Sequence, residues 1–177
     1  MKKISVILYN IRSTYNVGAI LRTCDCLGVD EVIFTGYTPF IDKGLPHEQA
    51  KLRKQIHKTA LGAEDLVSWH RDDDIFNIIQ DAQSQGYTVC ALEQGENSLN
   101  FAELDQAKSR QLPAKTALIL GEEVHGIPAE ILNQCDQLLE IPMCGQKESF
   151  NVSVATGIAL WELRKSDLAD GRKHLRN

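Results

Sequence analysis

The sequence lacks an apolar run long enough to cross a membrane. None of its apolar stretches approaches the roughly 20 residues that a spanning helix requires, and no charged segment followed by an apolar one opens the chain. We therefore expect a cytoplasmic protein without a membrane partner.

With 177 residues, 43% of them hydrophobic and 24% charged, the chain can bury a core, and we expect one domain over residues 1–177. We expect residues 168–177 to be a disordered tail.

The cysteines form neither a disulfide framework nor a metal-binding motif. Five is an odd number, and Cys24-Asp25-Cys26 lacks both the usual metal-ligand spacing and a second ligand pair. His125 has no second histidine near it in the sequence that would complete a metal site. We expect reduced, mostly buried thiols and no metal.

Phosphate-binding motifs and an excess of positive charge are also missing. The absence of G-x-G-x-x-G and of a P-loop excludes the standard dinucleotide and P-loop sites. The formal net charge of −5 argues against a general nucleic-acid coat protein. Basic residues nevertheless gather in two places, as either a solvated helix face or a surface for RNA phosphates. One group is Lys51, Arg53, Lys54 and Lys58, and the other is a C-terminal tail with Arg164, Lys165, Arg172, Lys173 and Arg176.

Strands and helices alternate along the chain. Short apolar, partly β-branched segments predict strands at Ile4–Leu8, Glu31–Thr35, Tyr87–Leu92, Thr116–Leu120 and Leu138–Ile141. Helical patterns predict helices after Asn16, within Gly36–Gly62, and at Asp74–Gln85, Pro128–Cys135 and Asn151–Lys165. This order predicts an α/β fold, with a mainly parallel sheet covered by helices on both faces.

The first and last helices differ in their apolar surfaces. The first has one apolar stripe, with Asn16 predicted as its N-cap and Gly28 as its stop. Arg22 lies roughly 160° from the centre of that stripe, where a solvated arginine is ordinary. In the last helix the apolar residues spread so widely that more than one face must be covered. That helix is therefore either central to the fold or packed on a partner chain.

Three loops after predicted strands carry the residues best suited to bind a ligand. They follow the strands that end at Leu92, Leu120 and Ile141, and ligands collect at such strand ends in open α/β sheets. Gly121 would let the backbone approach a ligand closely, and apolar side chains such as Leu120, Ile141 and Met143 could sandwich an adenine ring.

The polar residues of these loops also have simpler explanations when each is taken alone. Ser149 and Asn151 precede a helix, so either could serve as its cap. Glu123 could be a surface carboxylate and His125 a loop imidazole.

Taken together, three segments resemble a known family. Residues 16–23, NVGAILRT, place an Arg six residues after an Asn; residues 118–128, LILGEEVHGIP, place Gly-x-Glu after an apolar strand. Residues 141–153 begin with Ile-Pro-Met and end with Ser-x-Asn-Val-Ser. In this order they resemble the three motifs of the SpoU (TrmH) branch of the SPOUT RNA methyltransferases, and the resemblance spans roughly residues 4–165. Phe150 replaces the commoner Leu of the third motif.

The resemblance implies a SPOUT fold, in which the C-terminal segment forms a trefoil knot, and a homodimer through the last helix. It also implies S-adenosylmethionine as cofactor and methylation of a ribose 2′-hydroxyl in tRNA or rRNA. The cofactor-binding residues it implies are Leu92, Gly121, Ile141, Met143, Ser149 and Phe150. The implied catalytic residues are Arg22, Asn16, Glu123, Ser149 and Asn151. RNA would contact Arg12, Lys51, Arg53, Lys54 and Lys58.

Arg22 is the residue that the resemblance suggests for activating the 2′-hydroxyl. A guanidinium almost never gives up its proton, so a literal base role is unfavourable. Our interpretation is that Arg22 positions the hydroxyl and the adjacent phosphate through bidentate contacts, while the phosphate or water accepts the proton.

Two other functions compete with this one. The first is a protein of the same fold that binds RNA or cofactor without turnover. The second is a thiol- or metal-dependent enzyme that uses Cys24, Cys26 or Cys144. The motifs do not identify the RNA, the nucleotide or its base.

Overall fold

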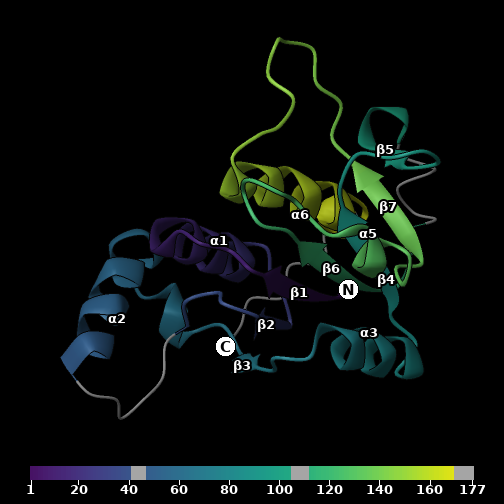
Figure 1. Cartoon of the computed structure of the whole chain (residues 1–177). Helices are drawn as coiled ribbons and strands as arrows, with labels where there is room; N and C mark the ends of the chain where they lie inside the picture. Colours follow the sequence, from purple (N-terminus) through teal and green to yellow (C-terminus); the bar gives the residue numbers. More distant parts are fainter. Residues whose placement is uncertain (41–46, 105–111, 170–177) are drawn as a thin grey trace.

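The computed structural model describes residues 1–40, 47–104 and 112–169 (Figure 1). Within these ranges the strands are β1 (Lys3–Tyr9), β2 (Glu31–Thr35), β3 (Trp69–Arg71), β4 (Thr88–Leu92), β5 (Leu99–Asn100), β6 (Lys115–Leu120) and β7 (Gln137–Glu140). The helices are α1 (Thr14–Cys26), α2 (His47–Ala60), α3 (Ile75–Ser84), α5 (Ala129–Leu132) and α6 (Val152–Ala169), with short turns η1 (Ala63–Asp65) and η2 (Phe101–Glu103). None of these helices is long and apolar enough to cross a membrane.

The strands form one parallel sheet in the order β3-β2-β1-β6-β4-β7-β5. Every pair of neighbouring strands in the described residues runs parallel. Val6 of β1 is in register with Val32 of β2 on one side and Leu118 of β6 on the other. The predicted parallel sheet is confirmed. Its strands consequently present their carboxyl ends along one edge.

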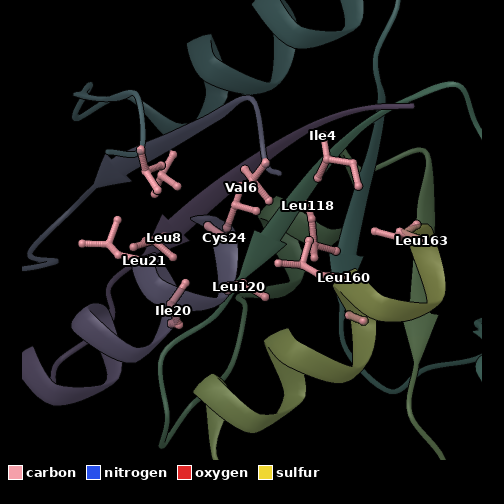
Figure 2. Packing of buried hydrophobic residues seen from close by; sticks show 14 of the residues in the cluster. Ile4, Val6, Leu8, Ile20, Leu21, Cys24, Leu118, Leu120, Leu160 and Leu163 are labelled. Atoms are coloured by element: carbon pink, nitrogen blue, oxygen red, sulfur yellow. The ribbon is translucent and has the colours of Figure 1, made fainter. Parts of the chain in front are cut away.

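Helices cover both faces of this sheet, as predicted. Successive strand side chains point to opposite faces. Ile4, Val6 and Leu8 therefore share one hydrophobic cluster with α1 and α6, part of which is shown in Figure 2. Ile7, between them in sequence, belongs to a second cluster with α3 and α5 residues such as Ile78. The two clusters form one core on each side of the sheet.

Helix α1 begins earlier than predicted. Ser13 is its N-cap, since the Ser13 backbone is extended and its side chain accepts a hydrogen bond from the Asn16 N–H. The prediction that Asn16 caps the helix was wrong, because Ser13 supplies the same capping chemistry three residues earlier. The amide side chain of Asn16 is thus left to bond elsewhere. Gly28 follows the helix with φ of 64°, the left-handed conformation expected of a stop.

Two short strands and the end of the last helix also differ from the sequence-based expectation. Strands β3 and β5 were not predicted, because segments of three and two residues are too short to show an alternating pattern. Leu168 and Ala169, expected to begin the tail, belong to α6. The rest of the expected tail, 170–177, lies outside the described residues.

Gly18 of the first motif allows α1 and α2 to pack closely. A Cβ at this position would collide with Thr59 Oγ1 and with the carbonyl oxygen of Ile56, and would lie 3.0 Å from the Ala60 nitrogen. The Thr59 hydroxyl also donates to the Tyr15 carbonyl at 2.9 Å. This glycine therefore fixes the position of α2 against α1.

Arg164 of α6 joins the last described helix to the first elements of the chain. Its Nε donates to the Leu27 carbonyl at 3.0 Å, its Nη2 to the Gly28 carbonyl at 2.5 Å, and its Nη1 to the Lys2 carbonyl and to Asp167. Arg164 lies in the predicted last helix, but the expectation that it belongs to a solvated or RNA-facing basic group was wrong, since it is 2% exposed. Two of these bonds satisfy the Leu27 and Gly28 carbonyls, which directly follow α1.

Replacing Arg164 by Met should lower the free energy of unfolding by about 3–5 kcal/mol, because Asp167 and the carbonyls would remain buried without their partner. Urea denaturation followed by circular dichroism measures this change. Lys165→Met is the matched control: among the contacts of the described residues it removes a surface pair with Glu162, and it should cost less than about 1 kcal/mol. Equal stability of the two variants would contradict the proposed role of Arg164.

Candidate active site

A pocket lies at the carboxyl ends of β6, β4 and β7, three neighbouring strands of the sheet. Its volume is about 330 Å³, within the range of small-molecule sites. In Figure 1 the segment that supplies one wall leaves β7 as a long loop before it returns to α6. The lining residues are Leu92, Glu93, Gln94, Leu120, Gly121, Glu122, Glu123, Val124, His125, Gly126, Leu139, Ile141, Met143, Glu148, Ser149, Phe150, Val152 and Ala155.

Two side chains that follow β4 tie the pocket walls together. Glu93 Oε1 accepts a hydrogen bond from the Ile127 N–H at 3.0 Å, and it occupies the place that a Cβ on Gly126 would take. Gln94 Nε2 donates to the Glu148 carbonyl at 2.8 Å. The loop after β4 is thus bonded to the loops after β6 and β7.

Gly121 permits the loop after β6 to fold back on itself. A Cβ there would lie 2.5 Å from Ile127 Cγ1 and 2.8 Å from the carbonyl carbon of Gly126. Gly126 has φ of 66°, and its N–H donates to the Glu122 carbonyl at 3.0 Å. Both glycines of the second motif are therefore required by the tight turn as well as by access to the pocket.

A chain of hydrogen bonds connects residues from all three motifs. Glu123 Oε1 accepts from Asn16 Nδ2 at 2.7 Å, and Asn16 Oδ1 accepts from Asn151 Nδ2 at 3.2 Å. Glu123 also accepts from the backbone N–H groups of Arg12 at 3.1 Å and Ser13 at 3.3 Å. One carboxylate therefore links the loop after β6 to the start of α1 and, through Asn16, to the start of α6.

Asn151 contributes to this chain and also caps α6. Its Oδ1 accepts from the backbone N–H of Ser153 at 3.0 Å and from the Ser153 hydroxyl at 2.7 Å. Capping was one of the two explanations left open for Asn151, and the structure shows that capping does not exclude the second contact. The amide nitrogen is directed to Asn16 while the oxygen holds the helix end.

The environment of Glu123 favours its charged form. Partial burial acts to raise its pKa, but hydrogen bonds from the Arg12 backbone, the Asn16 side chain and the Glu123 and Ser13 backbones together lower it. Glu123 is consequently a fixed negative charge at neutral pH.

The hydroxyl of Tyr37, which lies nearby, has a raised pKa. Its hydrogen bond to Glu122 raises the pKa of Tyr37 to about 12.

The predicted site residues fall into three positions. The six predicted cofactor-binding residues all line the pocket, and so does Glu123. Asn16 and Asn151 do not line it; Asn16 donates to Glu123, and Asn151 donates to Asn16. Arg22 is exposed on α1, does not line the pocket of its own chain, and has no hydrogen bond or ion pair to any described residue.

Several lining residues escaped the sequence analysis. Glu93 and Gln94 directly follow the strand end at Leu92, so their position was a usable signal. Glu148 immediately precedes the Ser149 of the third motif and offered a similar signal. Val152 and Ala155 lie in the first turn of α6, and their periodicity indicates only packing.

The charge of the lining distinguishes between classes of ligand. Four carboxylates, from Glu93, Glu122, Glu123 and Glu148, line the pocket, and the described lining contains no lysine or arginine. Such a site disfavours a di- or triphosphate, which would need cations or a phosphate cradle. It favours a ligand that is uncharged or carries positive charge.

The thiols are poorly placed for chemistry in this pocket. Cys24 is fully buried in α1, where burial raises the pKa of its thiol. Cys26 and Cys144 are exposed, and none of the three lines the pocket. In the part of the chain that the structure describes, no group of three His, Cys, Asp or Glu side chains could hold a metal ion.

The predicted RNA-contacting residues lie outside the pocket. Lys51, Lys54 and Lys58 are exposed on α2, with Lys58 Nζ 5.9 Å from the ring centroid of Tyr15. Arg53 is already paired with Asp65 at 2.6 Å. Arg12 is exposed at the pocket rim, with Nη1 3.7 Å from Glu122 Oε1. The basic residues at 172–176 lie outside the described residues.

Replacing Glu123 by Gln should remove a stability contribution that depends on pH. Because its folded pKa is lowered, Glu123 stabilises the fold above its unfolded pKa of about 4.5, and this contribution is lost as the pH falls through the lowered folded value. The difference in unfolding free energy between wild type and Glu123→Gln should therefore be constant at about pH 6–8 and shrink below about 4.5, in urea titrations at each pH. Glu130→Gln, which replaces an exposed carboxylate on α5, is the comparison variant. The same profile for both variants would refute a special role for Glu123.

Comparison with known proteins supports the predicted family. The chain is 30% identical over 164 residues to the tRNA (guanosine(18)-2′-O)-methyltransferase of Aquifex aeolicus, and the aligned region covers 93% of this chain and 70% of that protein. It is 31% identical over 165 residues to the 23S rRNA (guanosine-2′-O-)-methyltransferase RlmB of Haemophilus ducreyi, covering 93% and 60%.

Solved structures agree with these relatives. The crystal structure of the A. aeolicus TrmH/SpoU tRNA modifying enzyme superposes with a TM-score of 0.75 at 28% identity, over 97% of this chain and 78% of that one. The family model of the SpoU rRNA Methylase family matches residues 3–161, nearly the whole described chain. The predicted resemblance is confirmed, and the chain belongs to the SpoU rRNA methylase family.

Proposed function

We infer that the protein is an S-adenosylmethionine-dependent methyltransferase that modifies a ribose 2′-hydroxyl in RNA, either tRNA or rRNA. The observation that carries this inference is the junction of the three family motifs at one pocket, through the Glu123 carboxylate. An RNA substrate in turn implies a cytoplasmic protein.

The pocket fits the chemistry of this cofactor. Leu92, Leu120, Ile141 and Met143 provide apolar surface for an adenine ring, and Gly121 leaves backbone accessible. The surrounding carboxylates suit the positive charge of a sulfonium and an amino group, and the lining offers nothing for a phosphate chain. When bound, S-adenosylmethionine supplies an electrophilic methyl group. The residues of the chain then have to place the acceptor hydroxyl in line with it and exclude competing water.

Arg22 is the positioning group that we propose for the acceptor. It is exposed and has no partner among the described residues, so its guanidinium is available to a phosphate and a ribose hydroxyl together. Its proton affinity excludes a role as base, and the proton of the 2′-hydroxyl passes to the phosphate or to water.

We propose that a second copy of the chain brings Arg22 to a pocket. Because Arg22 does not line its own pocket, we propose a homodimer through α6 in which Arg22 serves the pocket of the partner. Val154, Trp161 and Leu168 of α6 are 48%, 53% and 47% exposed, an apolar surface of the kind that a partner covers. Gly157 of α6 lies against Thr23, the neighbour of Arg22 in α1. The apolar surface of α6 therefore lies near Arg22.

The remaining implied features are proposals of the same kind. RNA phosphates would contact Arg12, Lys51, Lys54 and Lys58. These exposed cations would neutralise phosphates and so release counterions from the RNA. Arg53 contributes less, because it is paired with Asp65. The trefoil knot and the single domain over residues 1–177 stay predictions.

The test is transfer of label from tritiated S-adenosylmethionine to separated tRNA and rRNA fractions. The wild type should label one fraction. Arg22→Ala should lower kcat at least about 100-fold, with cofactor affinity within about twofold by calorimetry, because the proposed contacts of Arg22 are to the acceptor hydroxyl and phosphate and not to the cofactor. Arg22→Lys should also be slow, since an ammonium lacks the bidentate fork.

Lys115→Met is the control for a lost positive charge. Lys115 begins β6, at the end of the strand away from the pocket, and within the described residues its ammonium contacts only the Gln85 carbonyl and the Tyr87 ring. This variant should keep the wild-type rate. Cofactor binding without label in either fraction would instead favour the protein that binds without turnover.

A further inference from the structure

An exposed aromatic side chain stands at the rim of the pocket. Tyr37 follows β2 by two residues and is 53% exposed. Its hydroxyl donates to Glu122 Oε2 at 2.5 Å, and Glu122 lines the pocket. The ring is therefore fixed beside the pocket while much of its surface faces solvent. None of the three motifs contains this residue.

The backbone that carries Tyr37 is unusually constrained. Asn10, after β1, has φ of 57°, a left-handed conformation that is uncommon for a residue other than glycine. Its Oδ1 accepts a hydrogen bond from the Tyr37 N–H at 3.0 Å and occupies the place of a Cβ on Gly36, where φ is 61°. Such strain persists where surrounding structure enforces it, often at functional sites.

A side chain from β3 braces the same turn. Arg71 Nη2 donates to the Gly36 carbonyl at 3.0 Å, and its guanidinium lies 4.3 Å from the ring centroid of Phe40. Asn10, Gly36 and Arg71 thus hold Tyr37 from three neighbouring strand ends. The turn that carries the Tyr37 ring is therefore bonded to the sheet, and these bonds limit the motion of the ring.

The charge beside Tyr37 suits a nucleic acid. Arg12, whose side chain is 61% exposed, reaches Glu122 from the other side and offsets part of its charge. An exposed aromatic ring next to an exposed cation can stack on a base while the cation meets the phosphate. A base within a helix has both faces covered, so only an unpaired base could use this ring.

We propose that Tyr37 is a stacking platform for an unpaired base at or next to the methylated nucleotide. This rests on the proposed function and adds to it: the enzyme would accept ribose hydroxyls in RNA loops and reject those in continuous helices. Tyr37 is a specificity-determining residue in this account, and it takes no part in methyl transfer.

The test compares Tyr37→Ala with Tyr37→Phe on the RNA fraction that the wild type labels. Phenylalanine keeps the ring and loses the hydrogen bond to Glu122, whereas alanine loses both. Tyr37→Ala should raise KM for RNA roughly 5- to 100-fold, the loss expected for one base stack, and leave kcat within about twofold. Tyr37→Phe should keep KM within about twofold. Calorimetry should give both variants the same cofactor affinity.

Other outcomes would overturn the proposal. Equal increases in KM for both variants would assign the effect to the hydrogen bond with Glu122, and an unchanged KM for Tyr37→Ala would exclude stacking. A Tyr37→Ala protein that elutes at a smaller size than the wild type would place Tyr37 in a contact between copies of the chain. Absence of label with the wild type itself would count against the methyltransferase function, which keeps the two failures distinct.

Discussion

The geometry of the site depends on one carboxylate. Glu123 lies in the loop after β6, and its hydrogen bonds to Asn16 and to two backbone N–H groups hold that loop against the start of α1. Asn16 also accepts a hydrogen bond from the side chain of Asn151 at the start of α6. The bonds span up to 135 positions of sequence, so they form only when the sheet and both helices are in place. The site and the fold are therefore built by the same contacts.

The proposed function divides cofactor binding and acceptor positioning between two parts of the chain. The pocket walls are bonded to one another by Glu93 and Gln94, and their carboxylates suit a positively charged sulfonium. Arg22, by contrast, lies on the exposed surface of α1 without a partner in the described residues. In the proposed mechanism Arg22 would contribute to the rate only through contacts to the acceptor that are stronger in the transition state than in the ground state.

The sequence predicted the parts of this structure that depend on local patterns. The main strands, the helices on both faces and the pocket after Leu92, Leu120 and Ile141 follow from apolar periodicity and from the position of ligands in parallel sheets. The hydrogen bonds from Asn151 to Asn16 and from Asn16 to Glu123 could not be predicted, since local rules assign each residue to a cap or to the surface. Arg164 was misplaced for a related reason: its buried partners are backbone carbonyls from the other end of the chain, which leave no trace in composition.

A crystal structure of the full chain with S-adenosylhomocysteine, the stable product of transfer, would show directly whether the pocket at the ends of β6, β4 and β7 holds the cofactor. We expect the adenine to lie among Leu120, Ile141 and Met143, with no phosphate-binding loop taking part. Density for the ligand at any other place on the chain, or an empty pocket in crystals grown with saturating ligand, would contradict this expectation.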